Sequence, residues 1–241
     1  MIEVRPFSAL GGADHGWLVA RHHFSFAGYH DPARMGWGRL RVWNDDEIAP
    51  GTGFGAHPHR DMEIVTYVRE GAITHRDSLG NTGRTEAGDV QVMSAGTGVV
   101  HEEHNLEPVP TRIFQIWVQP DRRGAAPAWG AKSFPKASRE GGRFEVLASG
   151  RAADAGNGAL PIHADAAVMA TTLAPGQGAT LRLAPGRAAY LVPAKGRVTV
   201  NGVAVGERDG AAVRDEAEVA VAVAADADGP AEVVVVEVAA A

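Results

Sequence analysis

The stretch from Gly51 to Glu63 reads Gly-Thr-Gly-Phe-Gly-Ala-His-Pro-His-Arg-Asp-Met-Glu and carries the strongest structural signal in the chain. In a β-strand the side chains of residues i and i+2 project from the same face, so His57 and His59 would point two imidazoles into one space. Glu63 has the same parity and would face the same interior if the strand continues through it without a bulge. The stretch therefore predicts part of a metal site on one face of a strand.

A second pair with the same spacing, His101 and Glu103, follows further along the chain. Two strands that each offer two ligands on one face can close a four-coordinate or larger site. Three nitrogens and one carboxylate suit iron, manganese, nickel, copper or zinc. A single His-x-His arises often by chance, but two such pairs among glycines predict that His57, His59, His101 and Glu103 bind one divalent transition metal.

Short apolar runs, separated by Gly or Pro, extend along the whole chain. With 30 Gly and 14 Pro the sequence suits long helices poorly, and its many Val residues favour strands. We expect strands at 38–44, 63–69, 72–77, 89–93, 112–118, 168–173, 180–183, 188–192, 196–200 and 232–238. Such spacing is typical of an all-β sandwich or barrel.

Histidines divide the chain into two parts, because nine of the ten lie before residue 121. The segment from Pro120 to Pro135 has the composition of a connector, and we place the domain boundary near 125 to 140, with a short helix inside that stretch. We therefore predict an N-terminal metal-binding domain at 1–125 and a C-terminal domain without metal at 126–241. Both could be the same kind of barrel, arising from an internal duplication.

Composition excludes several classes of protein. A net charge of −6 without a basic stripe argues against direct nucleic-acid binding. The chain has no cysteine, so disulfides and thiolate ligands are excluded. No apolar stretch is long enough to span a membrane, and Met1 to Pro6 does not read as a signal peptide. We therefore expect a cytoplasmic protein that does not bind membranes.

Longer motifs resemble one family in particular, the pirin family of the cupin superfamily. They are His23-Phe24-Ser25-Phe26, Leu40-Arg41-Val42-x-Asn44-Asp45-Asp46, His57-Pro58-His59-Arg60-Asp61-Met62-Glu63, His75-Arg76-Asp77-Ser78-x-Gly80-Asn81, Ser94-Ala95-Gly96-Thr97-Gly98 and Gln115-Ile116-Trp117. The resemblance is dense over about residues 20 to 120 and thinner after that.

The resemblance implies two cupin β-barrels of the jelly-roll type in tandem, with few short helices. It also implies one metal in the first barrel, bound by the residues that match His57, His59, His101 and Glu103, and a degenerate second barrel without metal. Fe(II) is the first expectation for that metal, with Mn, Ni, Cu or Zn as alternatives. Glu63 is not usually a ligand in this family, so we expect it to contact a ligand or a water.

The chain departs from the family pattern at Glu102 and His104. Their parity is opposite to that of His101 and Glu103, so they should point away from the metal. The alternatives are a register slip that exchanges Glu102 for Glu103, or additional charge at the mouth of the cavity.

Other motif residues receive less specific expectations. We expect His75, Gln115 and Trp117 in the wall of the substrate pocket, although a structural hydrogen bond is an equal alternative for His75. The expected turn-forming residues are Asp77, Ser78 and Asn81. We expect packing roles for His22, His23 and His30.

The resemblance implies two classes of function, between which the ligands do not decide. The first is a metal-dependent dioxygenase that opens the ring of a flavonol such as quercetin, with dioxygen as co-substrate and with Glu103 or Glu63 as the base. The second is a non-enzymatic, iron-dependent regulator that binds a protein partner. A storage-type cupin, in which metal only stabilises the fold, is a third class. An open apolar cavity beside the metal would favour the enzyme.

Overall fold

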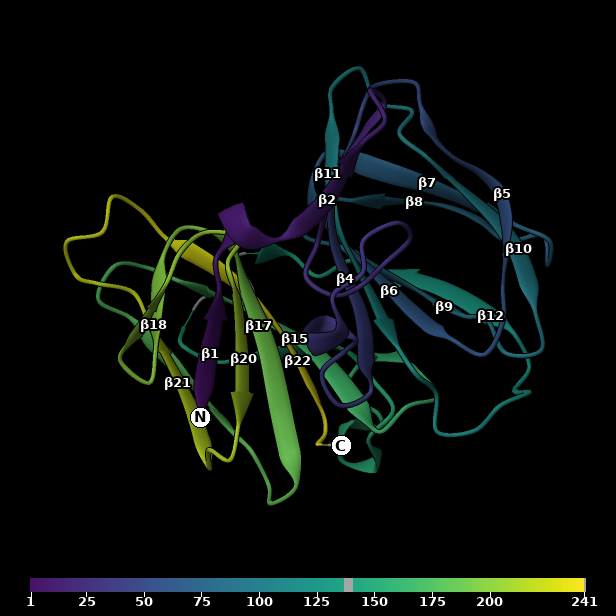
Figure 1. The fold of residues 1–241 in the computed structure, drawn as a ribbon. Coiled ribbons are helices and arrows are strands. Elements are labelled where there is room, and N and C mark those ends of the chain that lie inside the picture. Colours follow the sequence, from purple (N-terminus) through teal and green to yellow (C-terminus); the bar gives the residue numbers. More distant parts are fainter. Residues whose placement is uncertain (137–140, 241) are drawn as a thin grey trace.

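The computed structural model describes residues 1–136 and 141–240, and strands dominate it (Figure 1). The described residues form two domains, and each contains one seven-stranded and one four-stranded sheet. Short 3-10 helices include Phe7–Ala9, Pro32–Arg34 and Ala152–Asp154. The predicted all-β fold of two tandem cupin jelly rolls is confirmed. Among the described residues no helix has the length and apolar character needed to cross a membrane.

The first domain contains most of the strands drawn from purple to teal in Figure 1. Its seven-stranded sheet has the order β12 (Ala128–Lys132), β9 (Val90–Ser94), β6 (Glu63–Glu70), β11 (Thr111–Val118), β4 (Leu40–Ile48), β3 (Leu18–His22) and β2 (Gly11–Asp14). Its four-stranded sheet has the order β5 (Gly53–His59), β10 (Val99–His104), β7 (Ala72–Asp77) and β8 (Thr82–Glu86).

The second domain repeats this arrangement, which agrees with the expected duplication. Its seven-stranded sheet has the order β1 (Ile2–Arg5), β20 (Gly210–Arg214), β17 (Arg187–Lys195), β22 (Ala231–Ala239), β15 (Ala166–Leu173), β13 (Glu145–Ser149) and β14 (Leu160–Pro161). Its four-stranded sheet has the order β16 (Gly178–Arg182), β21 (Glu218–Ala222), β18 (Val198–Val200) and β19 (Val203–Val205).

Each of the ten predicted strands overlaps a strand of the structure, because alternating or continuous β-branched runs between turn residues determine them locally. Gly71, Gly80 and Gly202, which lie in turns between consecutive strands, have positive φ angles, as glycine allows. Residues 125–135, where part of the expected helix would lie, form no helix and contain strand β12, which pairs with β9. Residues 137–140, the rest of the stretch in which the helix was expected, lie outside the described residues.

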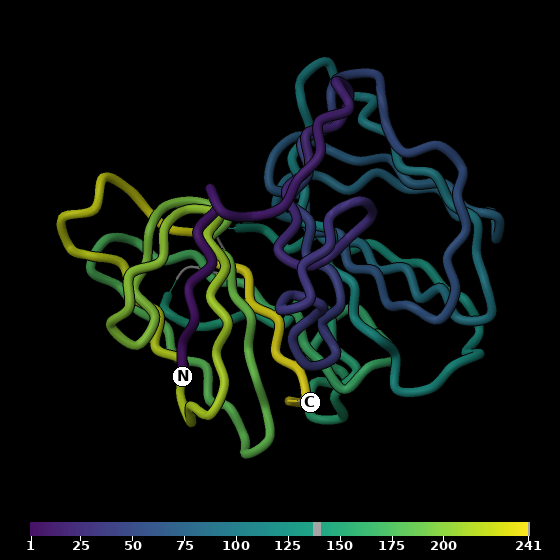
Figure 2. Tube along the Cα trace, viewed as in Figure 1, coloured from purple at the N-terminus to yellow at the C-terminus, as the bar shows by residue number. Residues whose placement is uncertain are grey.

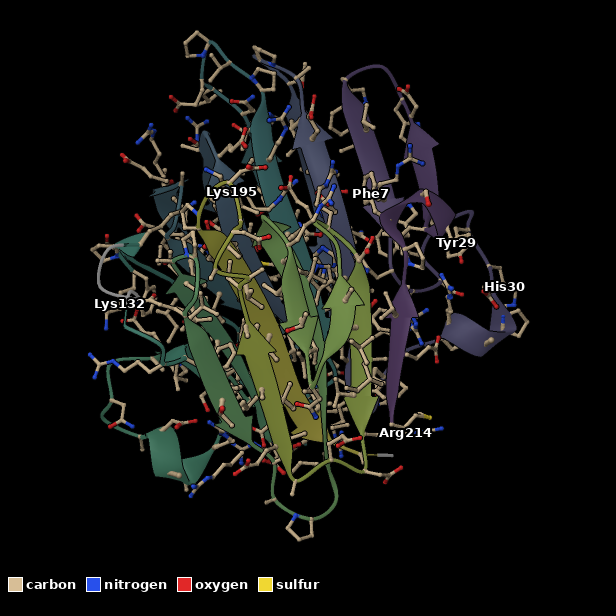
Figure 3. All side chains as sticks on the ribbon, turned by 90° about the vertical axis from the view of Figure 1, so that its left-hand side faces the viewer. Phe7, Tyr29, His30, Lys132, Lys195 and Arg214 are labelled. Carbon is tan, nitrogen blue, oxygen red and sulfur yellow. The ribbon has the colours of Figure 1, made fainter. Side chains whose placement is uncertain are left out.

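Two strands cross the predicted division between residues 125 and 126. Strand β12 follows that division in sequence but belongs to the first domain, whereas β1 precedes it and pairs antiparallel with β20 of the second domain. Figure 2 shows the N-terminal segment running along the second domain before it enters the first. The crossing occurs at Phe7, labelled in Figure 3, whose backbone N–H donates to Asp209 Oδ1 at 2.7 Å.

The largest apolar core lies between the two seven-stranded sheets. Side chains of both domains form it, among them Trp43 and Phe114 from the first and Tyr190 from the second, all fully buried. Beside it Asp45, also fully buried, forms ion pairs with Arg69 of its own domain and with Arg208 of the second. The two domains therefore share one core rather than meeting at a polar surface.

The interiors of the two jelly rolls differ in chemistry. In the second domain one continuous cluster fills the space between the sheets, and β16 and β21 contribute Ala179, Val219 and Val221 to it. In the first domain the apolar residues form two smaller clusters, around Ile113 and around Met93. Histidine side chains occupy part of this interior and come from strands β5, β10 and β7 of the first domain.

Candidate metal centre and cavity

Three neighbouring strands of the four-stranded sheet position the histidines. Strand β10 pairs on one side with β5, where His101 is opposite His57, and on the other with β7, where His101 is opposite Asp77. In the same register Glu103 is opposite His75. Directly opposed residues of antiparallel strands share a face, so these side chains all project into the interior of the barrel.

His57, His59 and His101 converge on one point. Their ring nitrogens lie within 4.8 Å of one another, and the Nε2 atoms of His57 and His101 are 3.1 Å apart. His101 is buried, whereas His57 and His59 are half-buried. The structure thus brings together the three predicted nitrogen ligands.

The hydrogen bonds and pKa values of these rings fit a metal. His57 Nδ1 lies 2.7 Å from the carbonyl oxygen of Gly55, which can only accept, so the neutral ring carries its lone pair on Nε2. Burial, together with the nearby His57, lowers the pKa of His59 to about 4 and that of His101 to about 3. Neutral imidazoles with converging lone pairs are the ligand form that divalent transition metals require.

Glu103 is not in the group formed by His57, His59 and His101. It forms a second potential ligand group with His75 and His101, again with ligand atoms within 4.8 Å. Its oxygens accept hydrogen bonds from Gln91 Nε2 at 2.5 Å and from Gln115 Nε2 at 2.8 Å. Burial raises the pKa of Glu103 to about 7, although these hydrogen bonds oppose the shift. His101 is thus common to both groups, and a single site formed by all four predicted ligands stays a prediction.

Glu63 does not continue the strand of the two histidines. Strand β5 ends at His59, the backbone turns at Asp61 with a φ of 47°, and Glu63 begins β6 in the other sheet. There Glu63 is buried, and its Oε2 accepts a 2.6 Å hydrogen bond from Ser94 Oγ. The strand of His57 and His59 therefore does not continue to Glu63, and the expectation that depended on a continuous strand is wrong. Among the described residues Glu63 belongs to neither potential ligand group.

Glu102 and His104 point outward, as their parity predicted. About one third of each side chain is exposed, and His104 Nε2 lies 3.5 Å from Glu102 Oε2. Glu102 also lies 3.8 Å from Arg76 Nη1. Strand β10 pairs with β7 without interruption from His101 to His104, whereas its pairing with β5 shifts register between His101 and Glu103. Glu103 is nevertheless buried and Glu102 is partly exposed, so Glu102 does not take the place of Glu103.

A cavity of about 360 Å³ opens onto His57 and His59. We call it the aromatic cavity, because its wall includes Trp17, Phe26, Phe54 and Trp117. Polar side chains in the wall are His15, His22, Asn44, Asp46 and Gln115. This volume lies in the range of small-molecule sites, about 300 to 1,000 Å³.

The sequence predicted only part of this wall. Gln115 and Trp117 line the cavity as expected, whereas His75 is fully buried behind His101 and is not a lining residue. Asp46 also lines the cavity, although the sequence indicated only that it belongs to the motif ending in Asn44-Asp45-Asp46. Burial raises the pKa of Asp46 well above its usual range, and its Oδ1 has no hydrogen-bond partner among the described residues.

The expected packing role holds for His23 and for His22, which packs against Phe26 and Tyr29, and it fails for His30. His23 is fully buried, and its Nδ1 lies 2.9 Å from Tyr190 Oη of the second domain. His22 lines the aromatic cavity, where its Nδ1 lies 2.9 Å from Asn44 Oδ1. His30 is exposed (Figure 3).

The two jelly rolls and the histidine cluster in the first define a bicupin. The chain matches the pirin family over residues 3–118 and the family described as quercetinase C-terminal cupin domain over residues 146–238. It belongs to the pirin family.

Relatives support this assignment along the whole chain. A pirin-like protein of Caulobacter vibrioides is 61% identical over 221 residues, 92% of this chain and 94% of that protein. A quercetin 2,3-dioxygenase of Escherichia coli K12 is 41% identical over 222 residues, 92% of this chain and 93% of that protein. The crystal structure of a bacterial pirin from Escherichia coli in complex with nickel(II) covers 100% of both chains with a TM-score of 0.90 and 38% identity.

Proposed function

We propose that the protein is a metal-dependent dioxygenase that opens the ring of a flavonol such as quercetin. The observation that carries this proposal is the aromatic cavity, which opens directly onto His57 and His59. A non-enzymatic regulator has no need of such a cavity beside its metal ligands, so this feature favours the enzyme. The name of the Escherichia coli relative is consistent with the same reaction.

We propose that His57, His59, His101 and Glu103 bind the metal. A divalent transition metal at this position would supply open coordination sites for an anionic substrate oxygen and for dioxygen. Fe(II) remains the first expectation, and the nickel complex of the related bacterial pirin supports Ni(II) as an alternative.

The cavity wall suits a planar phenolic compound. Trp117 and Phe26 contact each other edge to face with centroids 5.4 Å apart, and Trp17 and Phe54 do the same at 5.3 Å. Such aromatic walls bind flat ring systems and exclude water. The orphaned Asp46 oxygen would provide a polar contact for a substrate hydroxyl or carbonyl group.

Glu103 is the better candidate for the base that accepts the proton of the flavonol 3-hydroxyl. Without metal the pKa of Glu103 is about 7, and a bound cation would lower it, so Glu103 would be deprotonated and able to accept a proton near neutral pH. Neither glutamate lines the cavity itself, but Glu103 accepts a hydrogen bond from Gln115, which does line it, and belongs to a potential ligand group with His101. Glu63 is held by Ser94 and belongs to no potential ligand group among the described residues. The hydroxyl must come within about 3 Å of the base, directly or through one water.

Oxygen consumption tests this function. The protein is loaded anaerobically with Fe(II), Mn(II), Ni(II) or Cu(II), and quercetin is added in air-saturated buffer. We expect uptake that depends on metal and is lost in His59→Ala. The matched control is His104→Ala, which removes an outward-facing histidine near the site and should retain uptake. Absence of uptake with every metal, despite tight metal binding, would refute the enzyme and favour the partner-binding regulator.

A further inference from the structure

A line of hydrogen bonds leads away from the histidine cluster into the sheet. His101 Nδ1 lies 3.4 Å from His75 Nδ1, and His75 Nε2 lies 3.1 Å from Asp77 Oδ2. The side chains of His75 and Asp77 are almost completely buried. Asp77, His75, His101 and His57 thus form one connected series that ends at the proposed metal position.

The carboxylate end of this series is held firmly by the turn that follows β7. Asp77 Oδ1 accepts the backbone N–H groups of Leu79 at 2.9 Å and Asn81 at 3.0 Å. Asp77 Oδ2 also accepts from Asn81 Nδ2 at 2.9 Å. With these donors directed at it, the carboxylate acts as an acceptor, so the hydrogen between Asp77 and His75 belongs to His75 Nε2.

Stacking against an aromatic side chain also fixes the orientation of the His75 ring. The indole of Trp129 on β12 stacks on it with centroids 4.9 Å apart and an angle of 9°. Gly83 leaves room for this indole, because a Cβ atom there would lie 2.1 Å from Trp129 Cη2. His75 therefore has one orientation in which Nε2 faces Asp77 and Nδ1 faces His101.

These contacts determine which nitrogen of His101 carries hydrogen. A neutral His75 with hydrogen on Nε2 has only a lone pair on Nδ1, so the facing Nδ1 of His101 must be the donor. His101 then has its lone pair on Nε2, directed at the same point as that of His57. We infer that Asp77 and His75 are positioning residues that fix His101 in the Nδ1–H tautomer and thereby prepare its Nε2 to bind the metal.

The inference rests on the metal site of the proposed function, and it does not depend on which reaction that site catalyses. It gives a role to the motif His75-Arg76-Asp77-Ser78-x-Gly80-Asn81, which the sequence indicated mainly as a turn. Outer partners of this kind typically change metal affinity about 10- to 100-fold when they are removed.

The tautomer can be measured in the wild-type full-length chain without metal. Long-range proton–nitrogen correlation NMR at mildly alkaline pH distinguishes the two neutral forms of each histidine. We expect His101 and His57 as Nδ1–H tautomers and His75 as the Nε2–H tautomer. Finding hydrogen on Nε2 of His101 would overturn the inference, and this result requires neither a variant nor turnover.

Variants extend the test to metal binding. Asp77→Asn keeps an oxygen for the turn but places an amide N–H toward His75 Nε2, which should reverse the hydrogens along the series and put one on Nε2 of His101. We expect Ni(II) to bind about 10- to 100-fold more weakly by isothermal titration calorimetry. Ser78→Ala, in the same turn, is the matched control and should bind Ni(II) as the wild type does.

A second pair of variants separates hydrogen bonding from packing. His75→Asn retains an acceptor oxygen near the position of Nδ1 and should keep most of the affinity, whereas His75→Leu should lose it. Wild-type affinity in Asp77→Asn or in His75→Leu would overturn the inference, as would a wild type that does not bind Ni(II). Normal binding and tautomers without any turnover would refute only the proposed reaction.

Discussion

The carboxylates of the first domain differ in their surroundings although their sequence contexts look similar. Glu103 and Glu63 are both buried, but Glu103 lies among the amides of Gln91 and Gln115, next to His101. Glu63 is bound to Ser94 in the opposite sheet. Position in the fold, rather than residue type, therefore separates a candidate base from a structural carboxylate.

Isosteric substitution tests this difference. Glu103→Gln should reduce kcat with quercetin by about 10²- to 10⁴-fold, the usual contribution of a general base, or more if metal is also lost. Glu63→Gln should retain kcat within a small factor, because its partner Ser94 can still hydrogen-bond to an amide. Steady-state kinetics with metal content measured in each sample would check this. A larger loss in Glu63→Gln than in Glu103→Gln would contradict the assignment.

At the scale of elements, β12 supports the site from outside the predicted first domain. Trp129 on this strand covers His75, and Gly83 on β8 accommodates the indole. The contact between Trp129 and His75 depends on close packing, because the indole leaves no room for a methyl group at residue 83.

Gly83→Ala should therefore destabilise the protein by about 1 to 3 kcal/mol, as overpacking usually does, and should weaken Ni(II) binding by displacing Trp129. Chemical denaturation and calorimetry would measure the two effects. Gly28→Ala is the control, because a Cβ atom there meets nothing within 4 Å. Equal stability and affinity in both variants would contradict the role of Trp129.

The sequence predicted local features of the fold better than contacts between segments that are far apart in the chain. The ten strands and the pair His57 and His59 follow from spacing alone, because side-chain direction alternates along a strand. The break at Asp61 was missed because a non-glycine residue with positive φ gives little signal in one sequence. The pairing of β12 with β9 and the contribution of Trp17 to the cavity depend on long-range topology, which local patterns do not contain.

At the scale of the whole molecule, the shared core between the two domains includes a buried histidine. His23 pairs with Tyr190 across the interface, and burial, assisted by nearby Arg5, lowers the pKa of His23 to about 3. In the unfolded chain this histidine would titrate near 6.5. The unfolded state therefore binds more protons than the folded state between these two values, and stability should fall as the pH decreases below 6.5.

The expected slope for one such group is about 1.4 kcal/mol per pH unit across that window. His23→Asn, which keeps an acceptor for Tyr190 Oη, should be less stable at neutral pH but should show a smaller decrease in the free energy of unfolding on acidification. Urea titrations at several pH values would compare the two proteins. Identical slopes would show that His23 does not determine the acid sensitivity.

We propose that the metal centre and the aromatic cavity together insert dioxygen into a flavonol. The most direct test is to let the Fe(II)- or Ni(II)-loaded protein convert quercetin under isotopically labelled dioxygen and to analyse the products by mass spectrometry. We expect a ring-opened ester that contains both labelled atoms, together with released carbon monoxide. Oxidation of quercetin without incorporation of label, or no conversion by a protein with its metal bound, would contradict it.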